Sequence, residues 1–100
     1  MGIESGFTLL QLQEYLRCYD HQPGNRQGYF LKLIEEVGEL AEAIRKECRL
    51  TDQGGIKGTI EEELSDVLYY VAALANAYDV DLDRCFRLKD QLNEKKRKMR

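Results

Sequence analysis

Apolar residues recur at spacings of three and four along most of the chain, which is the repeat of an amphipathic α-helix. The repeat predicts four helices, over residues 8 to about 19, 28 to about 50, 59 to about 78, and from 81 into the C-terminal tail. The connections between them are short, so neighbouring helices are expected to run antiparallel. We therefore predict an all-α fold of the four-helix bundle type.

Capping residues support three of these helix starts. Thr8 with Gln11, and Thr59 with Glu62, have the spacing of a capping box, in which each side chain bonds the backbone N–H of the other residue. Asp81 stands where the N-cap of the last helix is expected. The glycine-containing segment 51–58, TDQGGIKG, is expected to end the second helix.

The third predicted helix carries more apolar surface than a small bundle needs. Asn76 is the only strongly polar residue between Val67 and Tyr78, so the third helix is apolar around most of its circumference. A single copy would leave part of this surface uncovered, which predicts a homo-oligomer, a homodimer or a homotetramer. The second helix has one apolar stripe that we expect to face the core, formed by Phe30, Leu33, Ile34, Val37, Leu40, Ala41, Ile44 and Cys48.

Length and composition predict a single domain over residues 1–100, with 43% hydrophobic content and a net charge of −3. This charge gives no reason to expect nucleic acid as a partner. The N-terminus lacks the features of a signal peptide and the apolar run 67–78 is too short to span a membrane, so a cytoplasmic location is expected. Cys18, Cys48 and Cys85 form no C-x-x-C pair, so each is expected to be a small core or half-buried residue.

Acidic residues interrupt the second helix beside its apolar stripe. Glu36 and Glu39 stand one turn apart, and Glu36 borders the stripe. Glu35 and Glu42 point further out. Because Glu42 precedes Lys46 by four residues, we interpret these two as an ordinary surface ion pair.

The third helix places two acids inside its apolar sector. Glu63 falls between Tyr70 and Leu74 on a helical projection, and Asp66 lies in line with Ala73. Buried carboxylates are costly unless they are paired or protonated.

If the acids of both helices converge, either their mutual repulsion raises their pKa values or a divalent cation neutralises them. Carboxylates without a matching histidine favour Mg²⁺, or Mn²⁺ as a substitute. A purely structural acidic face remains the alternative at this point.

The fourth helix continues its apolar line as a polar and cationic one. Leu82 and Phe86 begin the line. Such a line can bind the phosphates of an anion, and the alternative is a solvated C-terminal tail. Its polar members are Lys89, Asn93, Lys96 and Arg100.

The acidic motifs carry a resemblance to a known family. EEVGELAEAI, followed by EEELSDVLYYVAAL, resembles the MazG-type all-α nucleotide pyrophosphohydrolases, whose signature is E-E-x-x-E followed by E-x-x-D, and the resemblance covers about residues 27–100. It implies catalytic roles for Glu35 and Glu36, with Glu35 orienting or deprotonating water. It also implies substrate contacts from Lys89, Asn93, Lys96 and Arg100. The implied Mg²⁺ ligands are Glu36, Glu39, Glu63 and Asp66.

The reaction that the resemblance implies is hydrolysis of a nucleoside triphosphate by attack of water on the α-phosphorus, giving the monophosphate and pyrophosphate. Its expected role is house-cleaning of the nucleotide pool. Two alternatives stay open: a non-catalytic helical interaction module that binds through Tyr69, Tyr70 and Tyr78, and a phosphoribosyl-ATP pyrophosphohydrolase.

Overall fold

The computed structural model describes residues 2–99, and within this range the regular secondary structure is α-helical, without a β-strand. The all-α prediction is confirmed. Arg100, one of the expected substrate-binding residues, lies outside the described range. Five helices occupy residues 2–99: α1 (Leu9–Tyr19), α2 (Arg26–Arg45), α3 (Leu50–Gln53), α4 (Ile60–Ala77) and α5 (Leu82–Lys98).

The predicted caps are present, with one difference. The backbone N of Gln11 donates to Thr8 Oγ1 at 3.1 Å, and the backbone N of Thr8 donates to Gln11 Oε1 at 2.7 Å, which completes the capping box of α1. At α4, Thr59 Oγ1 accepts from the backbone N of Glu62 at 3.1 Å. Glu62 does not return the bond to Thr59, because its Oε1 accepts from the backbone N of Gly58 at 2.7 Å.

The connection between α2 and α4 contains a short helix that the sequence did not predict. Helix α2 ends at Arg45 instead of about residue 50, and the short helix α3 occupies part of the expected break. Glu61 at the start of α4 explains this, because its carboxylate accepts from the backbone N of Leu50 at 3.0 Å and from Arg49 Nε at 2.9 Å. These bonds tie α3 to the first turn of α4.

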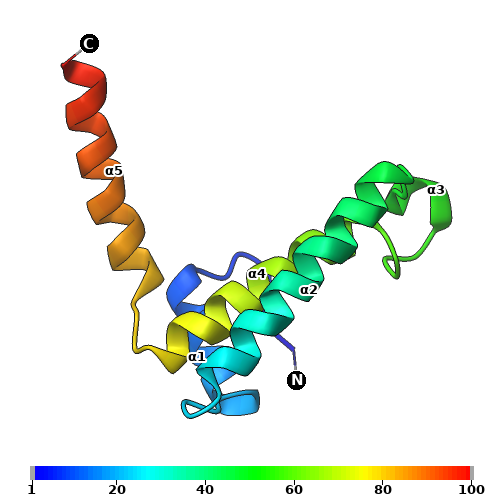
Figure 1. Ribbon diagram of the computed structural model, residues 1–100, viewed down its shortest axis with the longest axis horizontal. Helices are drawn as coiled ribbons and strands as arrows, with labels where there is room; N and C mark the ends of the chain where they lie inside the picture. The colour runs from blue at the N-terminus through cyan, green and yellow to red at the C-terminus, as the bar shows by residue number, and fades with distance from the viewer. Residues whose placement is uncertain (1, 100) are drawn as a thin grey trace.

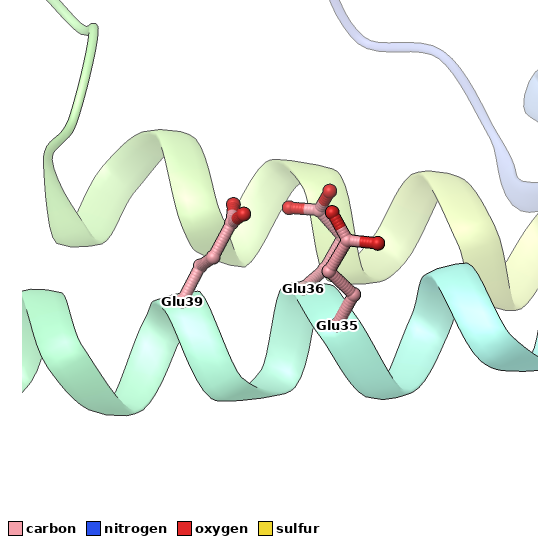
Figure 2. A group of neighbouring side chains, drawn as sticks. All are labelled: Glu35, Glu36 and Glu39. Carbon is pink, nitrogen blue, oxygen red and sulfur yellow. The ribbon is translucent and has the colours of Figure 1, made fainter.

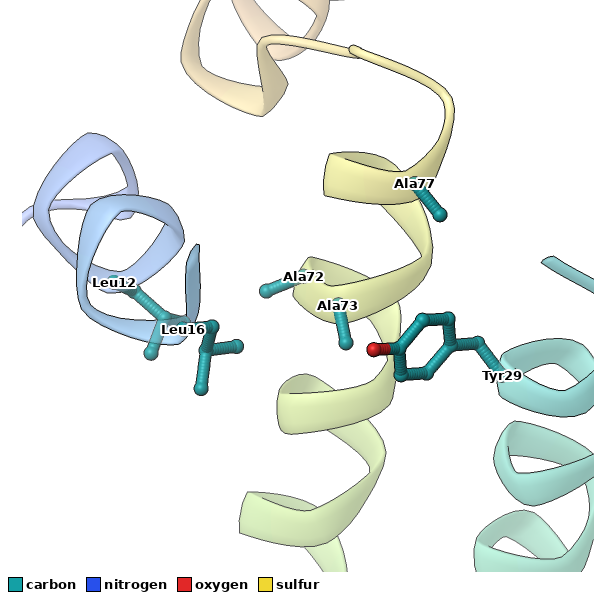
Figure 3. Packing of buried hydrophobic residues seen from close by; sticks show 6 residues of the cluster. All are labelled: Leu12, Leu16, Tyr29, Ala72, Ala73 and Ala77. Atoms are coloured by element: carbon teal, nitrogen blue, oxygen red, sulfur yellow. The ribbon is translucent and has the colours of Figure 1, made fainter. Parts of the chain in front are cut away.

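Helix α4 lies between α1 and α2 and packs against both (Figure 1). It runs antiparallel to α2. Figure 3 shows Leu12 and Leu16 approaching α4 from α1, while Tyr29 approaches it from α2. The buried α4 residues at these contacts are alanines, Ala72, Ala73 and Ala77, whose small side chains let both neighbouring helices come close.

Helix α5 leaves this three-helix core. It extends away from α2 and α4 in Figure 1, and none of its residues from Leu82 to Lys98 is buried. Leu82 packs against the core at the first turn. The predicted four-helix bundle is therefore not confirmed within one chain.

The apolar stripe predicted on α2 is mostly exposed in a single chain. Phe30, Ile34, Val37 and Ile44 are each about half exposed, between 49% and 51%. The inward side of α2 is formed by Tyr29, Glu36 and Ala43 instead. Helix α2 is therefore rotated about its own axis relative to the sequence prediction, so that the edge of the stripe and not its middle faces α4.

Two further expectations can be compared with the structure. Cys48 is half-buried as expected, whereas Cys18 and Cys85 are exposed, so the core interpretation is wrong for these two residues. Among the helices described over residues 2–99, none combines the length and apolar character needed to cross a membrane.

Candidate metal centre

Five carboxylates gather where α2 and α4 run side by side. Figure 2 shows Glu35, Glu36 and Glu39 rising from α2 toward α4. Carboxylate oxygens from these three residues lie within 4.8 Å of one another, and oxygens from Glu36, Glu63 and Asp66 do the same. Glu36 belongs to both groups. The structure thus brings together all four residues expected to hold a metal, and Glu35 beside them.

The two central carboxylates are buried and incompletely bonded. Glu36 and Glu63 are each 7% exposed. One oxygen of each, Oε2, is buried and has no hydrogen-bond partner among the described residues. Nor do the ion pairs of residues 2–99 include Glu36, Glu39, Glu63 or Asp66. A buried polar atom without a partner is rare in native proteins and calls for a specific explanation.

Burial and mutual repulsion hold these acids toward their protonated forms. Burial raises the pKa of Glu36 to about 7, and the negative charges of Glu39 and Asp66 contribute further. Burial also raises the pKa of Glu63, with contributions from Glu39 and Asp66. Burial likewise raises the pKa of Asp66, and the negative charges of Glu62 and Glu39 raise it further.

The donor set fits a hard divalent cation. All of its groups are carboxylate oxygens, the ligands that Mg²⁺ and Mn²⁺ prefer. A cation placed among them would offset the negative charge of the buried Glu36 and Glu63 carboxylates and the repulsion that raises their pKa values. Each helix supplies two of the four expected ligands, so the site depends on the packing of α2 against α4.

Glu35 and Glu42 lie at the edges of this group. Glu35 is exposed, and its carboxylate forms an ion pair with Lys32 Nζ at 3.4 Å. Within residues 2–99, the four expected metal ligands form no such ion pair. Glu42 pairs with Arg45 at 2.6 Å and with Lys46 at 3.2 Å, which confirms it as a surface ion pair. The hydrogen bond from Arg45, and to a smaller extent the one from Lys46, lowers the pKa of Glu42 to about 2.

A depression of about 260 Å³ opens beside the acids at the α3 end of the α2–α4 pair. Glu39, Glu63 and Lys46 are among the residues that line it, so a lysine side chain borders the same space as two candidate metal ligands. Sequence reasoning assigned Lys46 only to its pair with Glu42. Its spacing of seven residues from Glu39 was the available signal, because that spacing returns to the same side of a helix.

Comparison with known proteins decides the family. The model of the MazG nucleotide pyrophosphohydrolase domain matches residues 25–100. The chain belongs to this family. The matched range covers α2 to α5, and so contains every residue of the acidic group, whereas α1 precedes it.

Solved and curated relatives agree with this assignment. Two crystal structures of iMazG from Vibrio DAT 722 superpose with TM-scores of 0.80 and 0.78 at 46% and 45% identity, covering 90% and 88% of this chain and 97% and 99% of those chains. dCTP pyrophosphatase 1 of Rattus norvegicus is 38% identical over 81 residues, and that of Homo sapiens is 37% identical over 83. Each match covers 76% of this chain, which spans 46% of the length of either curated relative.

The polar line of α5 is not brought to the acids within one copy of this MazG domain. Lys89 and Lys96 are exposed and Asn93 is half-buried. All three stand on the helix that extends away from α2 and α4 (Figure 1). Any contact between these residues and a ligand at the acidic group therefore requires more than one copy or a different direction of α5.

Proposed function

We propose that this chain is a Mg²⁺-dependent nucleoside triphosphate pyrophosphohydrolase. The observation that carries the proposal is the pair of buried, unpartnered oxygens of Glu36 and Glu63 at the meeting of α2 and α4. A purely structural acidic face would keep its carboxylates solvated or paired. Membership of the MazG family, and relatives named dCTP pyrophosphatase 1, supply the reaction.

The position of each residue supports the role proposed for it. Glu36, Glu39, Glu63 and Asp66 would hold Mg²⁺. When bound, Mg²⁺ supplies positive charge to the phosphates and promotes ionisation of the attacking water. Glu35, exposed beside Glu36, is the residue proposed to orient or deprotonate that water. The oxygen of water bonds to the α-phosphorus, the bond from that phosphorus to the bridging oxygen breaks, and pyrophosphate leaves.

The proposed active form is a homodimer or homotetramer. Exposed apolar residues on α2 would be covered by a second copy, and α5 extends outward from its own acids. We therefore propose that Lys89, Asn93, Lys96 and Arg100 contact a triphosphate held at the acids of another copy. Cations at this place would stabilise the charge that develops on the departing pyrophosphate.

dCTP is the first substrate to test, since the curated relatives are named for it. Removal of a triphosphate from the nucleotide pool is the proposed cellular role. The test is a panel of nucleoside triphosphates, canonical and modified, incubated with Mg²⁺ or with a chelator, with monophosphate and pyrophosphate quantified.

The proposal expects equal amounts of monophosphate and pyrophosphate, formed with Mg²⁺ and not with the chelator. Release of orthophosphate would contradict it. Absence of any hydrolysis across the panel would favour a non-catalytic interaction module, and hydrolysis confined to phosphoribosyl-ATP would replace the proposed substrate class.

A further inference from the structure

Gln13 is a buried polar residue on α1, a helix that precedes the range matched by the family model. Its side chain reaches the end of α4 and the start of α5. Gln13 Nε2 donates to Asn76 Oδ1 at 2.9 Å and to the backbone O of Val80 at 2.7 Å. Gln13 Oε1 accepts from the backbone N of Leu82, the first residue of α5, at 3.0 Å. One side chain thus bonds α4, the α4–α5 connection and α5.

Asn76 holds this amide in place. Gln13 and Asn76 are each 1% exposed, and Asn76 Nδ2 donates to the backbone O of Gln13 at 2.9 Å. Every polar atom of the Gln13 side chain is therefore bonded. An apolar residue at position 13 would leave the backbone O of Val80 and the backbone N of Leu82 without these partners.

Helix α5 has few other ties to the rest of the chain. Over Asp83–Lys98 its residues are exposed, except for the half-buried Asn93. The N-cap residue Asp81 bonds the backbone N of Arg84, which stabilises the helix start but does not orient it against α1 or α4. The direction of α5 is consequently set at its first turn, where Leu82 packs and Gln13 bonds.

We propose that Gln13 is a positioning residue that fixes the direction of α5 and, through it, the place of Lys89, Asn93 and Lys96 on the substrate. The second half of this statement rests on the proposed function, whereas the first half concerns the fold alone. A structural readout and a kinetic readout therefore test the two halves separately.

The structural experiment measures the direction of α5 directly. Spin labels are placed at Cys18 on α1 and at Met99→Cys beyond α5, with Cys48 and Cys85 replaced by serine. Labelled chains are diluted with unlabelled ones so that distances between copies do not contribute. Gln13→Leu is expected to broaden the distance distribution relative to the parent.

Tyr29→Phe is the matched control. Tyr29 is also buried, and its hydroxyl donates to Asp20 Oδ1 at 2.8 Å and accepts from the backbone N of Gln22 at 2.9 Å, far along the chain from α5. It should lower thermal stability without broadening the distribution. An unchanged distribution in Gln13→Leu, or equal broadening in Tyr29→Phe, would overturn the proposal.

The kinetic experiment is a double-mutant cycle. Gln13→Leu is expected to lower kcat/KM about tenfold or more in the parent, and by less than about twofold when Lys89→Ala and Lys96→Ala are already present. A loss of the same size in both backgrounds would mean that Gln13 acts only through general stability, which would overturn the positioning role.

A second variant covers the case in which Gln13→Leu does not fold. Gln13→Leu with Asn76→Leu removes both side-chain amides together, so neither is left buried without the other, while Leu82 still loses its partner. The same two outcomes apply to it. If the panel of triphosphates shows no hydrolysis, the proposed function fails, and the spin-label distances alone decide what Gln13 does to α5.

Discussion

Glu36 and Glu63 are the residues on which the proposed chemistry depends, and the sequence indicated them through a local conflict. An acid inside an apolar helical sector contradicts the pattern around it, and such conflicts mark functional positions. The structure confirms that both are buried and that Asp66 and Glu39 lie beside them. The sequence did not indicate that Lys46 lies near these acids, because its spacing to Glu42 was already explained by an ion pair.

The raised pKa of Glu36 predicts how the stability of the metal-free protein depends on pH. The folded protein keeps a proton on Glu36 up to pH of about 7, whereas an ordinary glutamate loses it near 4.5. The folded state therefore binds more protons over this window, and stability must fall as pH rises from about 5 to about 7. Thermal unfolding in chelator at several pH values measures this.

Glu36→Gln is the variant that isolates the effect, because the amide has a similar shape and no titrating proton. Its stability should change less steeply with pH over the same window, and saturating Mg²⁺ should flatten the dependence of the parent, since the cation replaces the proton. Identical slopes for the parent and Glu36→Gln in chelator would show that Glu36 does not hold its proton in the folded protein.

Most helix boundaries followed from the sequence, because caps and apolar spacing act within a few residues, whereas the end of α2 and the short helix α3 did not. Which side of each helix packs against the core did not follow from the sequence. Helix α2 turns most of its apolar stripe outward, and its buried residues are Tyr29, Glu36 and Ala43 instead. The direction of α5 depends on Gln13, whose bonds join residues 63 to 69 positions apart. Such long-range bonds leave no periodic trace in the sequence.

The polar line of α5 gives a prediction about individual cations. Lys89→Ala and Lys96→Ala should each lower kcat/KM by an amount that corresponds to about 1–3 kcal/mol of lost transition-state stabilisation, the range for lost hydrogen bonds to charged groups. Mg²⁺ binding at the acids should persist. Steady-state kinetics on the best triphosphate of the panel measures the loss.

Lys95→Ala and Lys98→Ala are the matched controls, because they remove the same charge from other sides of the same helix. They are preferable to changes at Arg97, which forms ion pairs with Glu94 at 2.7 Å and with Asp90 at 3.7 Å. Losses as large in the controls would mean that α5 attracts the substrate through its overall charge, and that Lys89 and Lys96 make no specific contact.

The complete molecule is predicted to be an assembly of copies, because one chain leaves a broad apolar surface on α2 and an isolated α5. Ile34→Lys should reduce association, measured by sedimentation at micromolar concentration, and should reduce hydrolysis as well, since α5 is proposed to act on the acids of another copy. Leu10→Lys on α1, where the leucine is 47% exposed, is the control. A parent that sediments as a monomer and hydrolyses triphosphate would refute the assembly.

Binding of Mg²⁺, followed by calorimetry near pH 6.5 in two buffers of different ionisation enthalpy, tests the metal centre most directly. The parent should bind the ion and release protons, because the pKa of Glu36 is raised to about 7 and its proton must leave. Glu36→Gln, Glu39→Gln, Glu63→Gln and Asp66→Asn should each weaken binding and abolish turnover, whereas Glu42→Gln should match the parent. Unchanged binding in any two of the four variants, or no binding by the parent, would contradict a metal centre formed by α2 and α4.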